Sequence, residues 1–234
     1  MLRYSRAYRF LRRLGRSLGV NGVVARMVGG DRYEDRFDRA FCASLRPGDC
    51  VWDVGANVGH YTQRFAAAVG PTGSVVAFEP GPVNAAALAK ATEALPNVRR
   101  MTIALGNDRS QVRFWQGDPA LGFQSRCLED GEASSLPSIL VDVRRGDDIV
   151  RESPTVTPNA IKIDVEGFEP EVIEGLGSLL SSDALHTIGV EVHQTILEQR
   201  GRDTAPGDIA HLLTHHGFHV TWVDHSHLIG QRRT

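Results

Sequence analysis

Residues 50–62, Cys-Val-Trp-Asp-Val-Gly-Ala-Asn-Val-Gly-His-Tyr-Thr, are the stretch of sequence that decides the fold. The stretch opens with β-branched and aromatic side chains, which are typical of a short buried strand. Gly55 and Gly59 follow and predict a tight turn whose backbone can approach a ligand closely. A helix that begins near Val58 would point its N-terminal N–H groups at that ligand.

The composition is that of a globular protein without an extreme charge. The 234 residues fit one α/β domain with a short extension. With 26 Lys and Arg against 28 Asp and Glu, the net charge of -2 gives no overall attraction to nucleic acid or to an anionic membrane. The 3 cysteines have no paired spacing, which argues against disulfides and zinc. Neither a spanning apolar run nor a signal peptide is recognisable, so we expect a soluble cytoplasmic protein.

The first 46 residues are expected to form a helical extension, and residues 47–234 the main domain. Arginines and apolar side chains alternate at helical spacing in residues 1–20, which predicts a basic amphipathic helix. We favour a helix packed on the domain over a surface arm that touches a membrane surface, acidic partners or RNA. Residues 31–45 predict a second helix that covers one edge of the sheet.

Strands and helices alternate along the rest of the chain. The predicted strands are residues 51–54, 74–78, 98–103, 160–164, 187–191 and 219–223, and the predicted helices are 61–69, 83–95, 172–180 and 208–216. Residues 111–116 look like a β segment outside this alternation, and residues 121–137 are interpreted as a mobile or substrate-covering loop. The pattern predicts a mostly parallel sheet with helices on both faces.

Polar side chains follow the ends of several predicted strands. Asp53, Glu79, Asp164, Glu191 and His193 all fall at or just past a strand end. The carboxyl ends of parallel strands meet at one edge of the sheet, where ligands of such folds bind. We therefore expect these five side chains to gather at one site.

The glycine turn favours S-adenosylmethionine over a dinucleotide. Glu79 can accept hydrogen bonds from both ribose hydroxyls, as an acid after the second strand does in nucleotide sites. A dinucleotide site requires a glycine where this chain has Asn57, and Asp53 would repel phosphates. A sulfonium or amino group would instead be attracted by that carboxylate. The same glycine pattern disfavours an NAD-linked dehydrogenase.

Three motifs in order resemble the FkbM-type family of S-adenosylmethionine-dependent class I methyltransferases. They are Asp-Val-Gly-Ala-Asn-Val-Gly at 53–59, Phe-Glu-Pro at 78–80, and Ile-Lys-Ile-Asp-Val-Glu-Gly-Phe-Glu at 161–169. The resemblance covers residues 51 to 193 and implies a Rossmann-like, seven-stranded, mostly parallel sheet. It also implies methyl transfer to a hydroxyl of a sugar, glycan or polyketide-type natural product. Residues 121–137 and both termini match nothing in the family pattern, so the acceptor is not indicated.

The resemblance also implies which residues bind the cofactor. They are Asp53, Gly55, Ala56, Asn57, Gly59, Glu79, Pro80 and Asp164.

A hydroxyl is a poor nucleophile, so its methylation needs a base or a metal ion. His193 is our first candidate for the base, because histidine titrates near neutrality. Glu166 and Glu191 are the other candidate catalytic residues. These three and Asp164 could instead bind Mg²⁺ or a similar divalent cation. We do not favour that metal, because Asp164 is assigned to the cofactor and Glu166 is expected to cap the helix that begins near Phe168.

Lys162 and the function of the fold each allow more than one interpretation. Lys162 either neutralises acids on its own face of the sheet or extends its ammonium group to solvent. A nucleic-acid methyltransferase would share the cofactor half, but the block after Asp164 has an acid where a flipped base would need an aromatic platform. A non-catalytic binding module on the same fold is the other alternative, although its strand-end carboxylates would then have no use.

Overall fold

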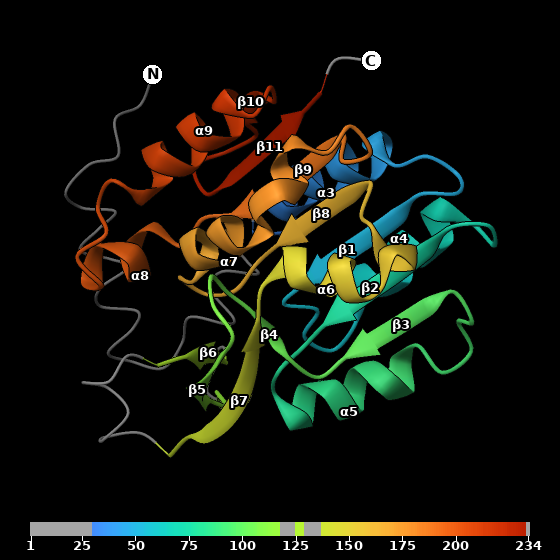
Figure 1. The fold of residues 1–234 in the computed structure, drawn as a ribbon, viewed down its shortest axis with the longest axis horizontal. Coiled ribbons are helices and arrows are strands. Elements are labelled where there is room, and N and C mark those ends of the chain that lie inside the picture. The colour runs from blue at the N-terminus through green and yellow to red at the C-terminus, as the bar shows by residue number, and fades with distance from the viewer. Residues whose placement is uncertain (1–29, 118–124, 129–136, 233–234) are drawn as a thin grey trace.

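A computed structural model describes residues 30–117, 125–128 and 137–232 (Figure 1). The predicted basic helix within residues 1–20, and most of the predicted loop 121–137, lie outside the described residues. Among the helices that are described, none is both long and apolar enough to cross a membrane.

A seven-stranded sheet forms the centre of the molecule and confirms the predicted fold class. Its order is β10 (His219–Trp222), β11 (His227–Gln231), β9 (Thr187–Glu191), β8 (Ala160–Ile163), β1 (Cys50–Val54), β2 (Ser74–Phe78) and β3 (Val98–Met101). The neighbours from β9 to β3 pair in parallel, whereas β11 runs antiparallel to both of its neighbours. The arrowheads of the parallel strands point to one side of the molecule, so their carboxyl ends share an edge (Figure 1).

Helices cover both faces of this sheet. One face carries α3 (Gly30–Ser44), α4 (His60–Val69) and α5 (Pro82–Ala91), and the other carries α6 (Gly146–Glu152), α7 (Glu169–Leu176) and α9 (Ala205–His215). Successive side chains of β1 point to opposite faces of the sheet and so contribute to the hydrophobic cores on both faces. Val51 packs in the core under α3 and α4, and Trp52 and Val54 pack in the core on the opposite face. All five residues of β1 are buried, which explains why the strand is so apolar.

A second, four-stranded sheet lies at lower left in Figure 1, on the side toward which the parallel strands point. Its order is β4 (Ala104–Leu105), β7 (Ile139–Arg144), β5 (Ser110–Trp115) and β6 (Arg126–Cys127). Ala104, Phe114, Val141 and Val143 form its own small core. Of these strands the sequence predicted only β5, as a β segment outside the main alternation.

Several helix boundaries differ from the prediction, and left-handed backbone explains two of them, one at Asn57 and Gly59 and the other at Gly177, whose φ is 49°. The helix expected from Val58 begins at His60, since Asn57 and Gly59 have φ of 51° and 91°. The helix expected through residue 180 ends as α7 at Leu176, and a 3₁₀ turn at 177–181 follows. The short helices α6 and α8 (Gln194–Gln199) were not predicted.

Candidate active site

A cleft lies between the carboxyl ends of β1, β2 and β8 and the small sheet. Of the residues predicted to bind the cofactor, it is lined by Gly55, Asn57, Glu79, Pro80 and Asp164. Phe114, Arg126 and Cys127 line it from the small sheet, and Glu166 lines it from the loop after β8. The predicted edge of the sheet therefore carries the cleft, and the unpredicted sheet supplies its second wall.

Gly55 is a glycine because another strand end packs on it. Its φ is 81°, and a Cβ built on it would lie 1.8 Å from the carbonyl oxygen of Asp164. The N–H groups of Gly55 and Ala56 both donate to the carbonyl of Phe78, at 3.0 Å each. The turn is thus held between β8 and β2, and this contact explains the glycine without any ligand.

Ala56 and Gly59 face α5 and not the cleft. Ala56 packs with Ala77 and Leu88 in a small buried cluster. A Cβ on Gly59 would lie 2.8 Å from a methyl carbon of Leu88. The prediction that these two residues contact the cofactor is therefore not supported, because their surroundings are those of a helix packed on a turn.

Glu79 presents a buried carboxylate to the cleft. Its Oε2 accepts a hydrogen bond of 2.9 Å from the N–H of Asn57, and its Oε1 accepts one of 2.9 Å from the N–H of Gly81. Burial raises the pKa of Glu79, and the two backbone donors oppose that shift. Each carboxylate oxygen can accept a further hydrogen bond. The pair of hydroxyls on a ribose fits this arrangement.

Asp53 lies under the cleft and out of reach of a ligand. The residue is fully buried, and its Oδ2 accepts a hydrogen bond of 2.6 Å from the hydroxyl of Thr62 on α4. Its Oδ1 lies 3.6 Å from Nζ of Lys162, the residue beside it on β8. The cation that Asp53 meets in this arrangement is an internal lysine, and its burial argues against the predicted direct contact with a sulfonium, which stays a prediction.

Lys162 connects the buried acid to the site. Its Nζ lies 3.2 Å from Asp164 Oδ2 as well as 3.6 Å from Asp53 Oδ1, and the residue is only 2% exposed. Burial acts to lower the pKa of Lys162, but the charges of Asp164 and Asp53 raise it above its usual range. Of the two interpretations of this lysine, neutralisation of its neighbours is the one observed.

Replacement of Lys162 by methionine is expected to lower the free energy of unfolding by about 3 kcal/mol or more, because it leaves a buried carboxylate without its cation. Lys90→Met is the matched control, since Lys90 is exposed near the end of α5 and its loss should cost less than about 0.5 kcal/mol. Urea denaturation of both variants measures the difference. Equal losses would show that the internal pair does not stabilise the fold.

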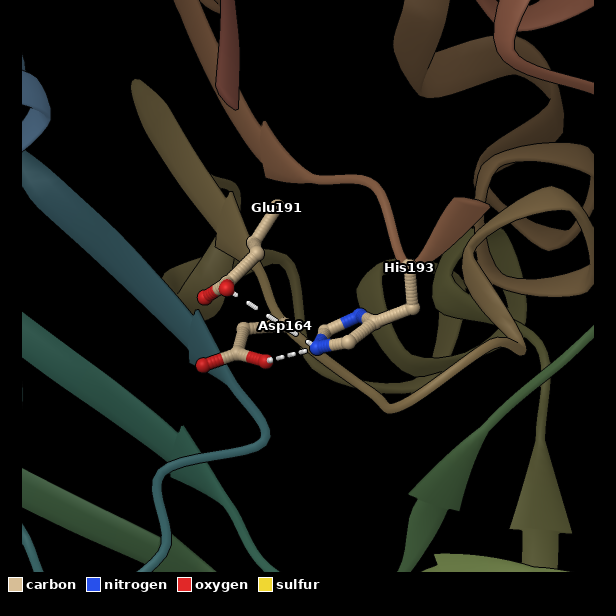
Figure 2. A group of neighbouring side chains, drawn as sticks. All are labelled: Asp164, Glu191 and His193. Atoms are coloured by element: carbon tan, nitrogen blue, oxygen red, sulfur yellow. Dashed lines mark ion pairs between the residues drawn. The ribbon is translucent and has the colours of Figure 1, made fainter. Parts of the chain in front are cut away.

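His193 lies among four carboxylates beside the cleft. Its Nδ1 is 2.9 Å from Glu169 Oε1, and its Nε2 is 3.1 Å from Glu166 Oε2. The same Nε2 lies 3.8 Å from Asp164 Oδ1 and 3.8 Å from Glu191 Oε1 (Figure 2). The sequence thus predicted correctly that Asp164, Glu191 and His193 gather at one edge.

The acids around His193 change its expected role. Burial acts to lower the pKa of His193, but the hydrogen bonds and charges of Glu166 and Glu169 raise it to about 12. In the absence of a bound cation, these acids therefore favour the protonated imidazole. This environment argues against a neutral imidazole as the base, and the catalytic role of His193 stays a prediction.

Glu169 is a site residue that sequence reasoning missed. It is fully buried, and its Oε1 accepts a hydrogen bond of 2.8 Å from the N–H of Gly167 in addition to its contact with His193. Glu166, which was expected to cap the following helix, has φ of 52° and turns its carboxylate to His193 instead. Glu169 belongs to the Lys-Ile-Asp-Val-Glu-Gly-Phe-Glu block, and that block was the only available signal.

Glu191 is held from the far side by a second histidine. Its Oε2 lies 3.4 Å from Nε2 of His227 on β11, and Nδ1 of His227 lies 3.0 Å from Asp224 Oδ2. Burial acts to lower the pKa of His227, but Glu191 and Asp224 raise it. Sequence spacing did not indicate this contact, because Glu191 ends β9 whereas Asp224 lies in the turn before β11.

Comparison with known proteins agrees with this geometry. A family model described as the methyltransferase FkbM domain matches residues 53–220. The hexuronic acid methyltransferase AglP of Haloferax volcanii is 27% identical over 78% of this chain and 69% of its own length. The 31-O-demethyl-FK506 methyltransferase FkbM of Streptomyces tacrolimicus is 32% identical over 86% of this chain and 84% of its own length.

A solved structure supports the fold alone. It is a Streptococcus mutans protein assigned as a methyltransferase and crystallised with SAH (S-adenosylhomocysteine). Its TM-score is 0.53 at 9% identity, and the match covers 86% of this chain and 98% of that one. The Rossmann-like sheet is therefore shared at an identity too low to transfer any residue's role.

Proposed function

Since the chain belongs to the FkbM family of S-adenosylmethionine-dependent methyltransferases, we propose which atom it methylates. The proposed acceptor is a hydroxyl oxygen of a sugar, a glycan or a polyketide-type molecule. The names of its two relatives support this class of acceptor, since one acts on a hexuronic acid and the other on a demethylated FK506.

One observation carries the proposal: Asp164 and Glu166 belong both to the wall of the cleft and to the cluster around His193. A cofactor bound in the cleft and an acceptor oxygen at the mouth of the cleft would therefore both lie next to the carboxylates of Asp164 and Glu166. A site that positions the acceptor against the methyl group supplies much of the catalysis of such a transfer.

The residues that would hold the cofactor are Glu79, Asn57 and Asp164, because all three line the cleft and the first two are already joined by a hydrogen bond. Glu79 would accept hydrogen bonds from the ribose hydroxyls. S-adenosylmethionine supplies, when bound, an electrophilic methyl group on its sulfonium. Asp53 would affect the cofactor only indirectly, because it pairs with Lys162, and Lys162 also pairs with Asp164.

The residue that would meet the acceptor hydroxyl is Glu166. Glu166 lines the cleft, and its carboxylate can accept a hydrogen bond from the hydroxyl while His193 holds it in place. His193 does not line the cleft and is in this proposal a positioning residue, which keeps several acids close together without mutual repulsion. Glu191 is also a positioning residue in this proposal, because it contacts His193.

The test is methyl transfer from radiolabelled S-adenosylmethionine to a panel of free uronic acids, neutral sugars and macrolide polyols. We expect a product whose label resists mild alkali, because a methyl ether forms at a hydroxyl. A label released by mild alkali would identify a methyl ester and would contradict the hydroxyl acceptor. A uronic acid is the sharpest probe, since it offers both groups in one molecule.

Glu79→Gln is expected to weaken the binding of S-adenosylhomocysteine about 10- to 100-fold, because the amide has one acceptor oxygen where the carboxylate has two. In the wild type, affinity should fall as the pH drops through the raised pKa of Glu79, since the protonated acid loses an acceptor. The variant should lack this pH dependence. Calorimetry from pH 5 to 8 measures both effects, with the exposed Glu93→Gln as the control. A pH profile unchanged in Glu79→Gln would assign the ribose to another residue.

A further inference from the structure

We propose that Asp164, Glu191 and His193 bind one divalent cation beside the cleft. One ligand atom from each lies within 4.8 Å of the other two. Figure 2 shows the imidazole and the two carboxylates turned toward one another from different segments of the chain. Asp164 follows β8, Glu191 ends β9, and His193 precedes α8, so the backbone that presents them is well packed.

The distances suit a shared cation. Nε2 of His193 lies 3.8 Å from one oxygen of Asp164 and 3.8 Å from one oxygen of Glu191. Two donors that bind one cation at about 2.1 Å each lie roughly 3 to 4 Å apart. At 3.8 Å the nitrogen and each oxygen are too far apart for a direct hydrogen bond. Imidazole together with carboxylates suits an ion such as Mn²⁺, which accepts both kinds of ligand.

A buried side chain outside the three ligands orients the site. Glu169 is fully buried, and its Oε1 faces Nδ1 of His193 at 2.9 Å, which turns Nε2 toward the other carboxylates. Glu166 Oε2 lies 3.1 Å from that Nε2, and a cation bound between Nε2, Asp164 and Glu191 would replace this contact. Its Oε2 is buried and has no hydrogen-bond partner within the described part of the chain. A carboxylate that holds the far nitrogen of a histidine is the usual outer partner of a metal ligand. His227, which is itself held by Asp224, contacts the second oxygen of Glu191.

The charges around the site also favour a cation. The connected carboxylates are Asp53, Asp164, Glu166, Glu169, Glu191 and Asp224. The cationic side chains among them are Lys162, His193 and His227. Acids therefore outnumber bases even with both imidazoles protonated, and a divalent ion offsets that excess in a partly buried space.

The catalytic use of this cation rests on the proposed function, whereas the site itself does not. Asp164 also lines the cleft, so a cation bound to it would lie near the acceptor oxygen. A divalent ion lowers the pKa of a hydroxyl that it contacts. Binding of the ion requires the neutral form of His193, so the cation takes the place of the ring proton, which is released to solvent.

The test is titration of the chelator-treated full-length protein with MnCl₂, followed through the electron paramagnetic resonance of free Mn²⁺, without cofactor or acceptor. We expect saturable binding of one ion per chain. Glu191→Gln should weaken it at least about 10-fold, and Glu169→Gln about 10- to 100-fold. Glu198→Gln, an exposed acid on α8, is the matched control and should bind as the wild type does.

Electron spin echo modulation of the bound Mn²⁺ in the wild type supplies a second measurement that needs no variant to fold. Coupling to an imidazole nitrogen is expected, and its absence would overturn the proposal, as would a wild type that binds no Mn²⁺. Binding with nitrogen coupling but without methyl transfer to any acceptor would count against the proposed function and leave the site intact. Turnover that survives exhaustive chelation would refute the catalytic use of the ion.

Discussion

Gly55→Ala is expected to destabilise the protein by about 4 kcal/mol or more and to abolish cofactor binding. The new methyl group would lie 1.8 Å from the carbonyl oxygen of Asp164, and the backbone has φ of 81°. Relief of this clash must move either the glycine turn or the end of β8, which carry Asn57 and Asp164 into the cleft. Urea denaturation and calorimetry with S-adenosylhomocysteine measure the two losses.

Gly201→Ala separates the clash from the cost of positive φ. Gly201 has φ of 68°, and a Cβ there would meet nothing within 4 Å. This variant should therefore lose only about 1 to 2 kcal/mol and should bind the cofactor as the wild type does. If Gly55→Ala loses no more than Gly201→Ala, the contact between the turn and β8 is softer than the structure indicates.

The central sheet could be predicted because its signals are local. Apart from the edge strand β3, the parallel strands are short, largely apolar runs, and turn residues such as Gly70 and Pro80 bound the runs. The β2 bounds at Ser74 and Phe78 and the β9 bounds at Thr187 and Glu191 agree with the prediction. Both β2 and β9 are buried on both faces and so keep a nearly continuous apolar pattern in the sequence.

The small sheet was missed because its signals are weak or nonlocal. β4 and β6 have two residues each and are strands only through their partners. β7 is different, since Ile139, Val141 and Val143 alternate with other residues and could have been interpreted as a strand. Its pairing with β5 bridges a segment of mixed composition, which hid the connection.

The location of the candidate site could be predicted from the sequence, but the roles of its residues could not. Strand ends placed Asp164, Glu191 and His193 together, because the parallel topology brings them to one edge. Roles depend on which groups meet in three dimensions, and the pairing of Asp53 with Lys162 crosses two strands. The acids that surround His193 come from residues 164–169 and from Glu191, and only the fold brings both stretches onto the ring, so its charge could not be inferred from sequence spacing.

His193→Gln is expected to lower kcat for methyl transfer at least about 100-fold and to change the affinity for S-adenosylhomocysteine less than about 3-fold. The reason is position: His193 lies behind Asp164 and Glu166, which line the cleft, and is not itself among the lining residues. Without the ring, the two carboxylates lose the group that fixes their direction toward the acceptor. His215→Gln, on an exposed histidine of α9, is the control and should retain full turnover.

The division of the effect between kcat and KM tests this role against a merely structural one. A structural role would lower the amount of folded enzyme, and kcat per folded molecule and KM would then stay unchanged. A positioning role lowers kcat per folded molecule, and Glu166→Gln should share that loss because Glu166 faces the cleft directly. If both variants keep at least a tenth of the wild-type kcat, the cluster around His193 is not where the acceptor is activated, and the acceptor site must lie elsewhere along the cleft.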